Sequence, residues 1–392
     1  MSTVTTGGAA APDAPAATPG TTGTRGVPAG PGTWRVTWHG VRTVATLELR
    51  QRVRSTRWKI ALLVWFLVVG AITALAWAAM ASASSGPGVE PERLGPALFG
   101  LVVFFVLFLG LVVAPTLSAT AINGDRSAGT LAILQVTLLS PAEIVLGKLL
   151  ASWAAALAFL VVSVPFLVAG VAAGGTPVLS VVVCLVVLAL LLAGVCAIGL
   201  GFSALTARSA GSAVLTYLAV AGLTVLSLLV FGLTIPAVSN QPEEVRVWTV
   251  PSSYDWDDER VPECVWETQT QYVSHTERTW WLLAVNPFVV VADAAPAGDE
   301  ADTSVGLDLL GGIRTGVRTL RAGPAPEEDY CWTGQERDAS YVSPVAERDI
   351  DDSAVWPWGL AANLLLGAAG VALAVRRLRI PQRTLARGTR VA

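Results

Sequence analysis

Six long apolar runs constrain this chain more than any other feature of its sequence. Each holds about 20 or more residues, and none contains Asp, Glu, Lys, Arg or His. A helix of about 20 apolar residues crosses the hydrocarbon core of a bilayer, whereas buried helices of soluble proteins rarely reach this length without a charge. We therefore predict six transmembrane helices. The runs are about Ile60–Ala81, Leu94–Ser118, Leu149–Ala172, Pro177–Ser203, Gly211–Val238 and Val355–Val375.

The composition supports a membrane protein and excludes three other classes. Charged residues make up 14% of the chain and hydrophobic residues 53%, whereas a soluble globular chain is about 25% charged. So few charges cannot cover a soluble surface. A soluble enzyme, a disordered chain and a nucleic-acid binder with a basic face are therefore excluded.

Charge is distributed unevenly, and this predicts the topology. The stretch 239–354 carries 23 acidic residues against 8 Arg, a net of −15, and the rest of the chain carries 18 Lys and Arg against 6 acids, a net of +12. Lys and Arg favour the cytoplasmic loops of membrane proteins. With both termini inside, 17 of those 18 cations lie in the cytoplasm and only Arg93 lies in a short outer loop. The acidic stretch then lies outside the cell membrane.

This topology divides the chain into six parts. Residues 1–33, rich in Ala, Gly, Pro and Thr and without a signal-peptide core, are expected to form a disordered cytoplasmic tail. The other expected parts are an interfacial helix (34–58), spans one to five (59–238) with an inner loop (119–148), an acidic outer domain (239–354), span six (355–376) and a basic cytoplasmic tail (377–392). The predicted fold class is therefore an all-α polytopic membrane protein with one large outer loop domain.

Two cysteines lie in the outer block, where the surroundings are oxidising. Cys264 and Cys331 are predicted to form a disulfide that closes a loop of about 68 residues; the alternative is two free thiols too far apart. Cys184 and Cys196 share the fourth span and are expected to be small apolar filler.

Residues 34–58 have the pattern of a basic amphipathic helix. An apolar stripe recurs at three- and four-residue steps, with arginines beside it. We expect this helix to lie in the headgroup layer of the inner leaflet, or alternatively to pack on another subunit. The stripe consists of Trp34, Trp38, Val41, Ala45, Leu49 and Val53.

The loop between spans two and three is the most informative stretch. It opens with the charged pair Asp125 and Arg126, followed by a Gly-Thr turn and a short apolar segment, Leu131 to Val136. Ser140-Pro141-Ala142-Glu143 is a capping box, which predicts a helix that enters the membrane through Gly147 and Lys148. The apolar segment needs a partner, either the membrane domain itself or a groove in another protein.

These residues resemble the first cytoplasmic loop of type-2 ABC-transporter permeases. The shared pattern is an acidic-Arg pair, Gly-Thr-Leu, an apolar patch, a Ser-Pro turn with an acid, and Gly-Lys. The interfacial helix and the six spans with both ends inside also resemble that family. The matching residues are Asp125, Arg126, Gly129, Thr130, Leu131, Ser140, Pro141, Glu143, Gly147 and Lys148.

The resemblance implies a coupling helix that docks on a separate ATP-binding cassette subunit. Arg126 would make a charged contact at the rim of the cleft, while Leu131 and Leu134 would anchor it. A second permease copy or a close relative would complete the pathway, and the cofactors ATP and Mg would be held by the partner subunit. The implied docking residues are Asp125, Arg126, Gly129, Thr130, Leu131, Leu134 and Gln135.

Other functions fit the sequence less well. The chain has no Gly-x-x-x-x-Gly-Lys-Ser/Thr loop for nucleotide phosphates, so no catalytic residue or enzyme activity is expected in it. Its spans hold no ionisable residue of the kind that ion-coupled carriers use. The outer acids lack the spacing of a calcium loop and either bind cations or simply keep that domain soluble; no metal site is expected.

The prediction from sequence is thus the permease subunit of an ABC exporter in the cell membrane. An ion-free pathway favours a hydrophobic or amphipathic cargo. The alternative is a membrane anchor or assembly protein that displays the acidic outer domain. Within that domain, the apolar segment 280–294 is too short to span and is expected to be an interfacial or re-entrant helix, with Asn286 and Pro287 at a turn.

Overall fold

Six helices in a computed structural model of the chain are long and apolar enough to cross a membrane, as the sequence predicts. The structure describes residues 32–83, 94–130, 139–174, 176–239, 241–255, 262–296, 308–331, 342–345, 351 and 353–379. The spans are α2 (Thr56–Ala83), α3 (Leu94–Ser118), α6 (Pro141–Ala172), α7 (Val178–Leu205), α8–η2–α9 (Ser209–Val238) and α13 (Trp356–Arg377).

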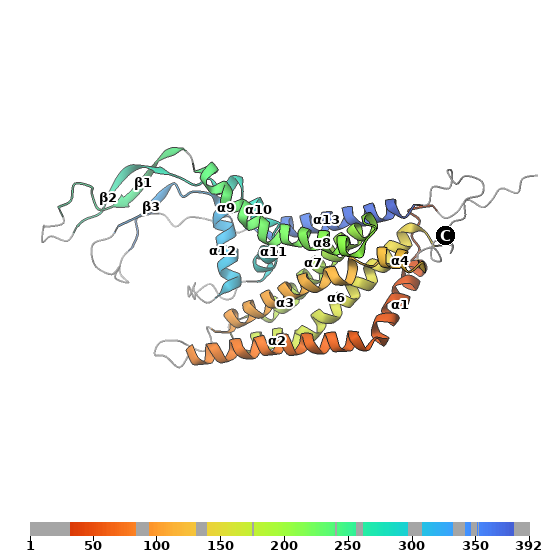
Figure 1. The fold of residues 1–392 in the computed structure, drawn as a ribbon. Helices are drawn as coiled ribbons and strands as arrows, with labels where there is room; N and C mark the ends of the chain where they lie inside the picture. Colours follow the sequence, from red (N-terminus) through yellow and green to blue (C-terminus); the bar gives the residue numbers. More distant parts are fainter. Residues whose placement is uncertain are drawn as a thin grey trace, which may run out of the picture.

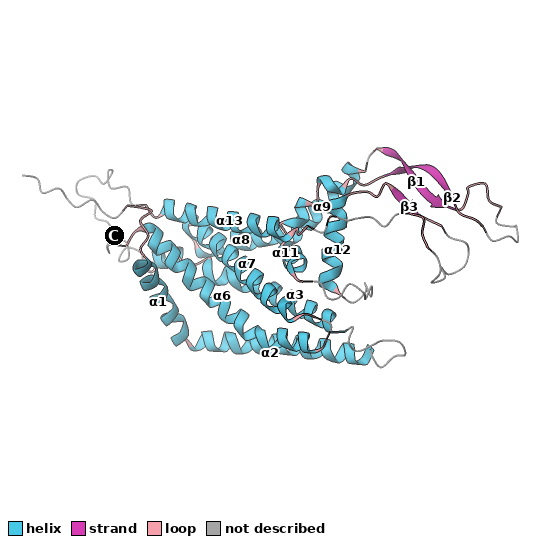
Figure 2. Ribbon diagram, turned by 180° about the vertical axis from the view of Figure 1, so that it is seen from behind, coloured by secondary structure: helices cyan, strands magenta, loops and turns pink. Residues whose placement is uncertain are grey.

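The spans form one bundle with α3 and α7 at its centre (Figures 1 and 2). In the most apolar stretch of each of these two helices 61% of the residues are buried, against 22% in α2 and 17% in the fifth span. The helix α1 (Trp38–Arg54) and the short helix α4 (Asn123–Ser127) lie at one end of the bundle, and the β-strands lie at the other. The interfacial-helix segment and the acidic block therefore lie at opposite ends of the molecule.

Helices α7 and α13 cross at very short range because glycines line the contact. A Cβ atom added to Gly201 would lie 2.7 Å from the Cα of Gly370, and one added to Gly367 would lie 3.1 Å from the Cα of Gly194. Small residues let two helix backbones approach closely, which increases van der Waals contact in a membrane. This crossing packs the last span against the fourth, through glycines about 170 residues apart in the chain.

The fifth span is interrupted by a π-helical turn. Helix α8 (Ser209–Ala221) and helix α9 (Ser227–Val238) flank η2 (Gly222–Leu226). A π turn displaces the regular backbone bonding, and the side chain of Asn286 bonds to it: Nδ2 donates to the carbonyl oxygen of Thr224 at 2.7 Å. The apolar run predicted the length of this span but not the interruption.

The acidic block contains a small sheet, which corrects the all-α prediction. Strand β1 (Pro242–Thr249) pairs antiparallel with β2 (Val265–Tyr272) and parallel with β3 (Glu327–Asp329), in the order β2-β1-β3. In β1, Val245 and Val247 are buried while Arg246 between them is exposed. This alternation is the two-residue period of a half-buried strand.

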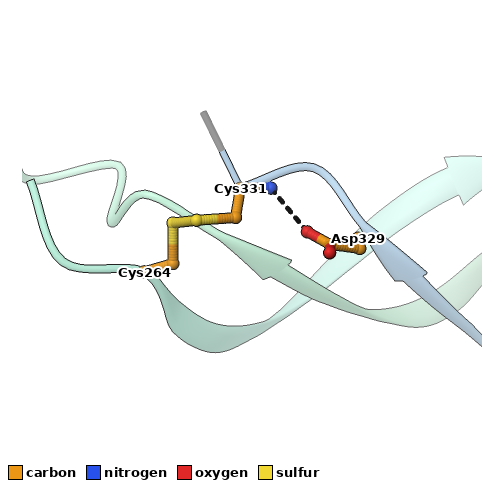
Figure 3. Close-up of a disulfide and its surroundings, with 3 residues drawn as sticks. All are labelled: Cys264, Asp329 and Cys331. Carbon is orange, nitrogen blue, oxygen red and sulfur yellow. Dashed lines mark hydrogen bonds between the residues drawn. A yellow bond between two sulfur atoms is a disulfide. The ribbon is translucent and has the colours of Figure 1, made fainter. Parts of the chain in front are cut away.

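Cys264 and Cys331 form the predicted disulfide (Figure 3). Their Cα atoms are 5.7 Å apart and their sequence separation is 67 residues. The bond joins the residue before β2 to a residue just after β3, and the amide of Cys331 donates to the carboxylate of Asp329 at 2.9 Å. It therefore fixes the two outer strands of the sheet to each other.

The segment 280–294 consists of two short helices rather than one. They are α10 (Trp281–Ala284) and α11 (Pro287–Ala294), separated at Asn286, which is the N-cap of α11. Val290 is fully buried and Val291 nearly so, in the same core cluster as side chains of α3 and α7. This segment is thus built into the helical bundle and does not lie flat on its surface.

One buried carboxylate connects α11 to the last span. Asp293 accepts hydrogen bonds from the amides of Val355 (2.6 Å) and Trp356 (2.8 Å), at the start of α13. It also accepts from Arg318 Nε at 2.8 Å, in helix α12 (Leu309–Ala322). The first amides of a helix have no partners within the helix, so Asp293 acts as a cap supplied by another segment.

Candidate functional site

The loop between the second and third spans begins with the short helix α4. After α4, Gly129 has φ +73°, a left-handed conformation that glycine adopts without steric cost. Thr130 is exposed and its hydroxyl donates to the carbonyl oxygen of Asp125 at 3.3 Å. The next residues, 131–138, lie outside the described residues, so the predicted contacts of Leu131, Leu134 and Gln135 stay predictions.

A serine of the fourth span holds the beginning of α4. The hydroxyl oxygen of Ser203 accepts from the amide of Ile122 at 3.0 Å and from that of Asn123 at 3.2 Å, and Ser203 is fully buried. Ile122 at the N-cap position has no side-chain acceptor of its own. Ser203 thus replaces the missing cap. The role of Ser203 could not be predicted from the sequence, because a single serine at the end of an apolar run has no pattern that marks it as a helix cap.

A buried lysine links α4 to two other helices. Lys148 in α6 is 1% exposed, and its Nζ lies 2.5 Å from Oδ2 of Asp125 in α4 and 2.5 Å from Oε1 of Glu48 in α1. A buried ammonium is tolerated only when it is paired and hydrogen-bonded. We call Glu48, Asp125 and Lys148 the junction triad. The triad directs Asp125 into the protein, while the neighbouring Arg126 is exposed.

Arg52 supplies a second cation at the same junction. Its Nη2 donates to the carbonyl oxygen of Leu117 at 2.9 Å, in the last turn of α3. Carbonyl groups at a helix C-terminus lack partners within the helix and favour a nearby positive charge. Burial lowers the pKa of Arg52 and the charge of Glu48 opposes this change, but an arginine stays protonated at physiological pH. Arg52 therefore adds a second positive charge near Glu48 of the triad.

Glycines let α1 lie directly on the start of α6. A Cβ atom on Gly147 would be 2.6 Å from Cβ of Val44, and one on Gly40 would be 2.7 Å from Cδ of Glu143. Both separations are too short for real Cβ contacts, so a larger residue at either position would move α1 away. The Gly147-Lys148 pair thus has two structural roles. Gly147 leaves room for α1 to pack closely on α6, and Lys148 forms an ion pair with Glu48 of α1.

The predicted capping box forms, and it also serves α1. The hydroxyl of Ser140 accepts from the amide of Glu143 (3.1 Å), and Glu143 Oε2 accepts from the amide of Ser140 (2.8 Å). Pro141 occupies the first turn. The other oxygen of Glu143 accepts from Thr37, the N-cap of α1, at 2.8 Å from its amide and 2.5 Å from its hydroxyl. One carboxylate therefore caps two helices.

The apolar stripe of α1 is divided between two environments. Val41 and Ala45 are buried, while Trp34, Trp38 and Val53 are exposed. The buried part packs on α6 of the same chain, as Gly40 and Val44 do. The exposed tryptophans are free to meet the inner leaflet, which stays a prediction.

The arrangement as a whole makes α1, α4 and the ends of α3, α6 and α7 one mechanical unit. On α4 and the turn that follows it, the exposed residues are Arg126, Ser127, Ala128, Gly129 and Thr130. Within the described ranges, no group of three or more His, Cys, Asp or Glu side chains is placed to hold a metal ion.

A partly open apolar cavity of about 10 Å³ lies among the spans, bordered by Trp65, Val106, Phe159 and Leu188 among other residues. A cavity needs roughly 10–15 Å³ to hold even one water molecule. This space between α2, α3, α6 and α7 is therefore too small for a substrate.

Comparison with known families decides the class of this chain. The sequence profile of the family described as "ABC-2 family transporter protein" matches residues 42–291, which is more than half of the chain. The chain belongs to the ABC-2 transporter family. The resemblance found in the inner loop is thereby confirmed, and the chain is a membrane-embedded permease of an ABC transporter. No curated protein matches it.

Family membership also gives the matched region its general role. ABC-2 permeases are membrane transport components that are generally not catalytic and that typically work with an ATP-binding subunit. The matched range begins inside α1 and ends inside α11. It therefore contains the junction triad, α4 and the sheet strands β1 and β2.

Proposed function

We propose that this ABC-2 permease is one half of an exporter driven by a separate ATP-binding cassette subunit. The loop that starts with α4 docks on that subunit in the cytoplasm. A second copy or a close relative supplies the other half of the pathway. The cargo is hydrophobic or amphipathic, because the spans carry no ionisable side chain along their apolar runs.

The observation that carries this proposal is the junction triad. A docking loop transmits force only if it is rigidly attached to the helices that it moves, because a flexible loop absorbs the displacement. Lys148 ties α4 to α1 and α6, and Ser203 ties it to α7. A displacement of α4 is thus passed to three helices at once, α1, α6 and α7.

The small internal cavity supports a two-part pathway. The apolar cavity between α2, α3, α6 and α7 is too small for a substrate. The fifth span and α2 are the least buried of the six. A pathway formed between two such bundles accounts for both facts.

Co-purification with candidate ATP-binding subunits from the same cell tests the proposal. The full-length chain is compared with Arg126→Glu and Leu131→Asp. Because a like-charge contact across an interface costs several kcal/mol, we expect at least a tenfold lower recovery of the ATPase with Arg126→Glu. The matched control is Arg379→Glu, the same charge reversal at an exposed arginine just after α13.

The result has two readings. Loss of the ATPase with both loop variants and not with the control, in chains that keep the size-exclusion profile of the unaltered protein, supports the docking surface. Failure to recover any ATPase, or equal recovery with all variants, contradicts the exporter proposal. The alternative role of a membrane anchor that displays the outer domain would then be favoured.

A further inference from the structure

The outer sheet is joined to the fifth span through one histidine. His275 follows β2 and precedes the short helix η3 (Thr276–Arg278). Its backbone amide donates to the carbonyl oxygen of Val238, the last residue of α9, at 3.2 Å. Beside it, the hydroxyl groups of Ser239 and Ser274 lie 2.6 Å apart. The two ends of the sheet's hairpin therefore meet at the outer end of α9.

The imidazole ring of His275 lies between two carboxylates from different segments. Its Nε2 is 2.8 Å from Oε1 of Glu243, at the start of β1, and its Nδ1 is 2.8 Å from Oε1 of Glu277 in η3. The side chain of His275 is only 19% exposed. The ring thus links the first strand of the sheet to the segment that leads toward α10.

This geometry suits only one protonation state of the ring. Carboxylates accept hydrogen bonds and donate none, while a neutral imidazole has a single N–H group. A neutral His275 would therefore aim one nitrogen lone pair at a carboxylate oxygen. The imidazolium donates to both carboxylates.

Each neighbouring segment contributes its own groups to this site. Glu243 comes from β1, and Glu277 and Arg278 come from η3, with Arg278 Nε 3.9 Å from Oε1 of Glu277. Helix α9 contributes a backbone carbonyl, and α12 contributes the carbonyl of Leu320, which accepts from Thr276 Oγ1 at 2.7 Å. The two carboxylates are therefore the charged groups in hydrogen-bond contact with the ring.

We propose that His275 is a pH-responsive latch that fixes the outer sheet to the outer end of the fifth span. When protonated, it holds Glu243 and Glu277 together. When it loses its proton, one of the two bonds is lost and the start of β1 is released. The latch depends only on the contacts of His275 within this chain and is independent of the exporter proposal.

The direction of the pH response follows from the two contacts. Glu243, and next Glu277, raise the pKa of His275 above its ordinary value of 6.5. A raised folded-state pKa gives a stabilisation that is complete below pH 6.5 and is lost as the pH rises through the folded-state pKa. The latch therefore holds in acidic surroundings and opens in alkaline ones.

The chain offers a clean titration, because His39 and His275 are its only histidines. The full-length His39→Gln variant, labelled with ¹⁵N-histidine and placed in nanodiscs, gives the NMR signals of one imidazole. We expect its pKa to lie above 6.5, with both ring nitrogens protonated below it. Glu243→Gln and Glu277→Gln each lower that pKa toward 6.5. A pKa at or below 6.5, or no change in either variant, overturns the proposal.

Hydrogen exchange measures the release of the start of β1 directly. In the unaltered chain, amide exchange at the start of β1 speeds up as the pH rises, after correction for the intrinsic pH dependence of exchange. The expected factor is roughly ten for each unit by which the pKa exceeds 6.5. His275→Gln removes this extra dependence, whereas Glu244→Gln, the exposed neighbour on the same strand, keeps it. An identical pH response in His275→Gln overturns the proposal.

Discussion

Lys148 Nζ and Asp125 Oδ2 lie 2.5 Å apart, so the third span directly holds the acid of the loop's acidic-Arg pair. The resemblance implied that Asp125 and Arg126 both belong to a docking surface. In the structure the two side chains have different surroundings. Asp125 pairs with Lys148 inside the junction triad, whereas Arg126 is exposed. We therefore expect Asp125 to act on α4 itself and Arg126 to act on the partner.

Removing the lysine of the triad should destabilise the fold. Lys148→Met leaves Glu48 and Asp125 without their cation, and we expect a loss of roughly 2–4 kcal/mol, because both acids keep some solvent contact. Thermal unfolding of the purified chain measures this loss. The triple variant with Glu48→Gln and Asp125→Asn should recover most of the stability but not transport. Unchanged stability of Lys148→Met would contradict a buried triad.

The cap supplied by Ser203 predicts a local effect. Ser203→Ala removes the acceptor for the amides of Ile122 and Asn123, which should cost about 1 kcal/mol. Hydrogen exchange in α4 should rise about fivefold, while exchange in the middle of α7 stays unchanged. Ser209→Ala, at an exposed position that begins α8, is the matched control. Equal exchange in both variants would exclude a capping role.

The close crossing of α7 and α13 predicts opposite outcomes for two glycine substitutions. Gly201→Ala places a Cβ atom 2.7 Å from the Cα of Gly370, so the helices must separate, which should cost about 1–3 kcal/mol. Gly232→Ala in α9 meets nothing within 4 Å and should gain up to about 1 kcal/mol in helix propensity. Thermal unfolding of both variants in the same detergent checks this. A Gly201→Ala chain as stable as Gly232→Ala would refute the crossing.

The disulfide predicts a countable labelling pattern. With the bond intact, no thiol should react with a maleimide, because Cys184 and Cys196 are buried. Mild reduction should expose two reactive thiols, and unfolding after reduction should expose four. Loss of the bond should weaken the outer domain by about 4 kcal/mol in the chain-entropy view, without unfolding the spans. Two labelled thiols before reduction would mean that Cys264 and Cys331 are not bonded.

Much of the structure of the acidic block could not be predicted from the sequence, for a physical reason. The buried and exposed residues of β1 alternate only over a few positions, and the sheet depends on pairing between β1 and β3, about 80 residues apart. The contact between His275 and Glu243 could not be predicted for the same reason, because the two residues are 32 positions apart in the chain. The interruption of the fifth span likewise depends on Asn286, which lies well after that span.

The apolar runs alone are sufficient to place six spans, because membrane insertion depends on about 20 consecutive residues and on nothing distant. The capping box of Ser140 and Glu143 is equally local, and the disulfide follows from having only two outer cysteines. The partners of Lys148, Gly147 and Ser203 are different. Lys148 pairs with Glu48 100 residues away and with Asp125 23 residues away, while Gly147 and Ser203 each contact a helix 80 to 105 residues away. Such contacts are set by how whole helices pack, so only the tertiary structure brings these residues together.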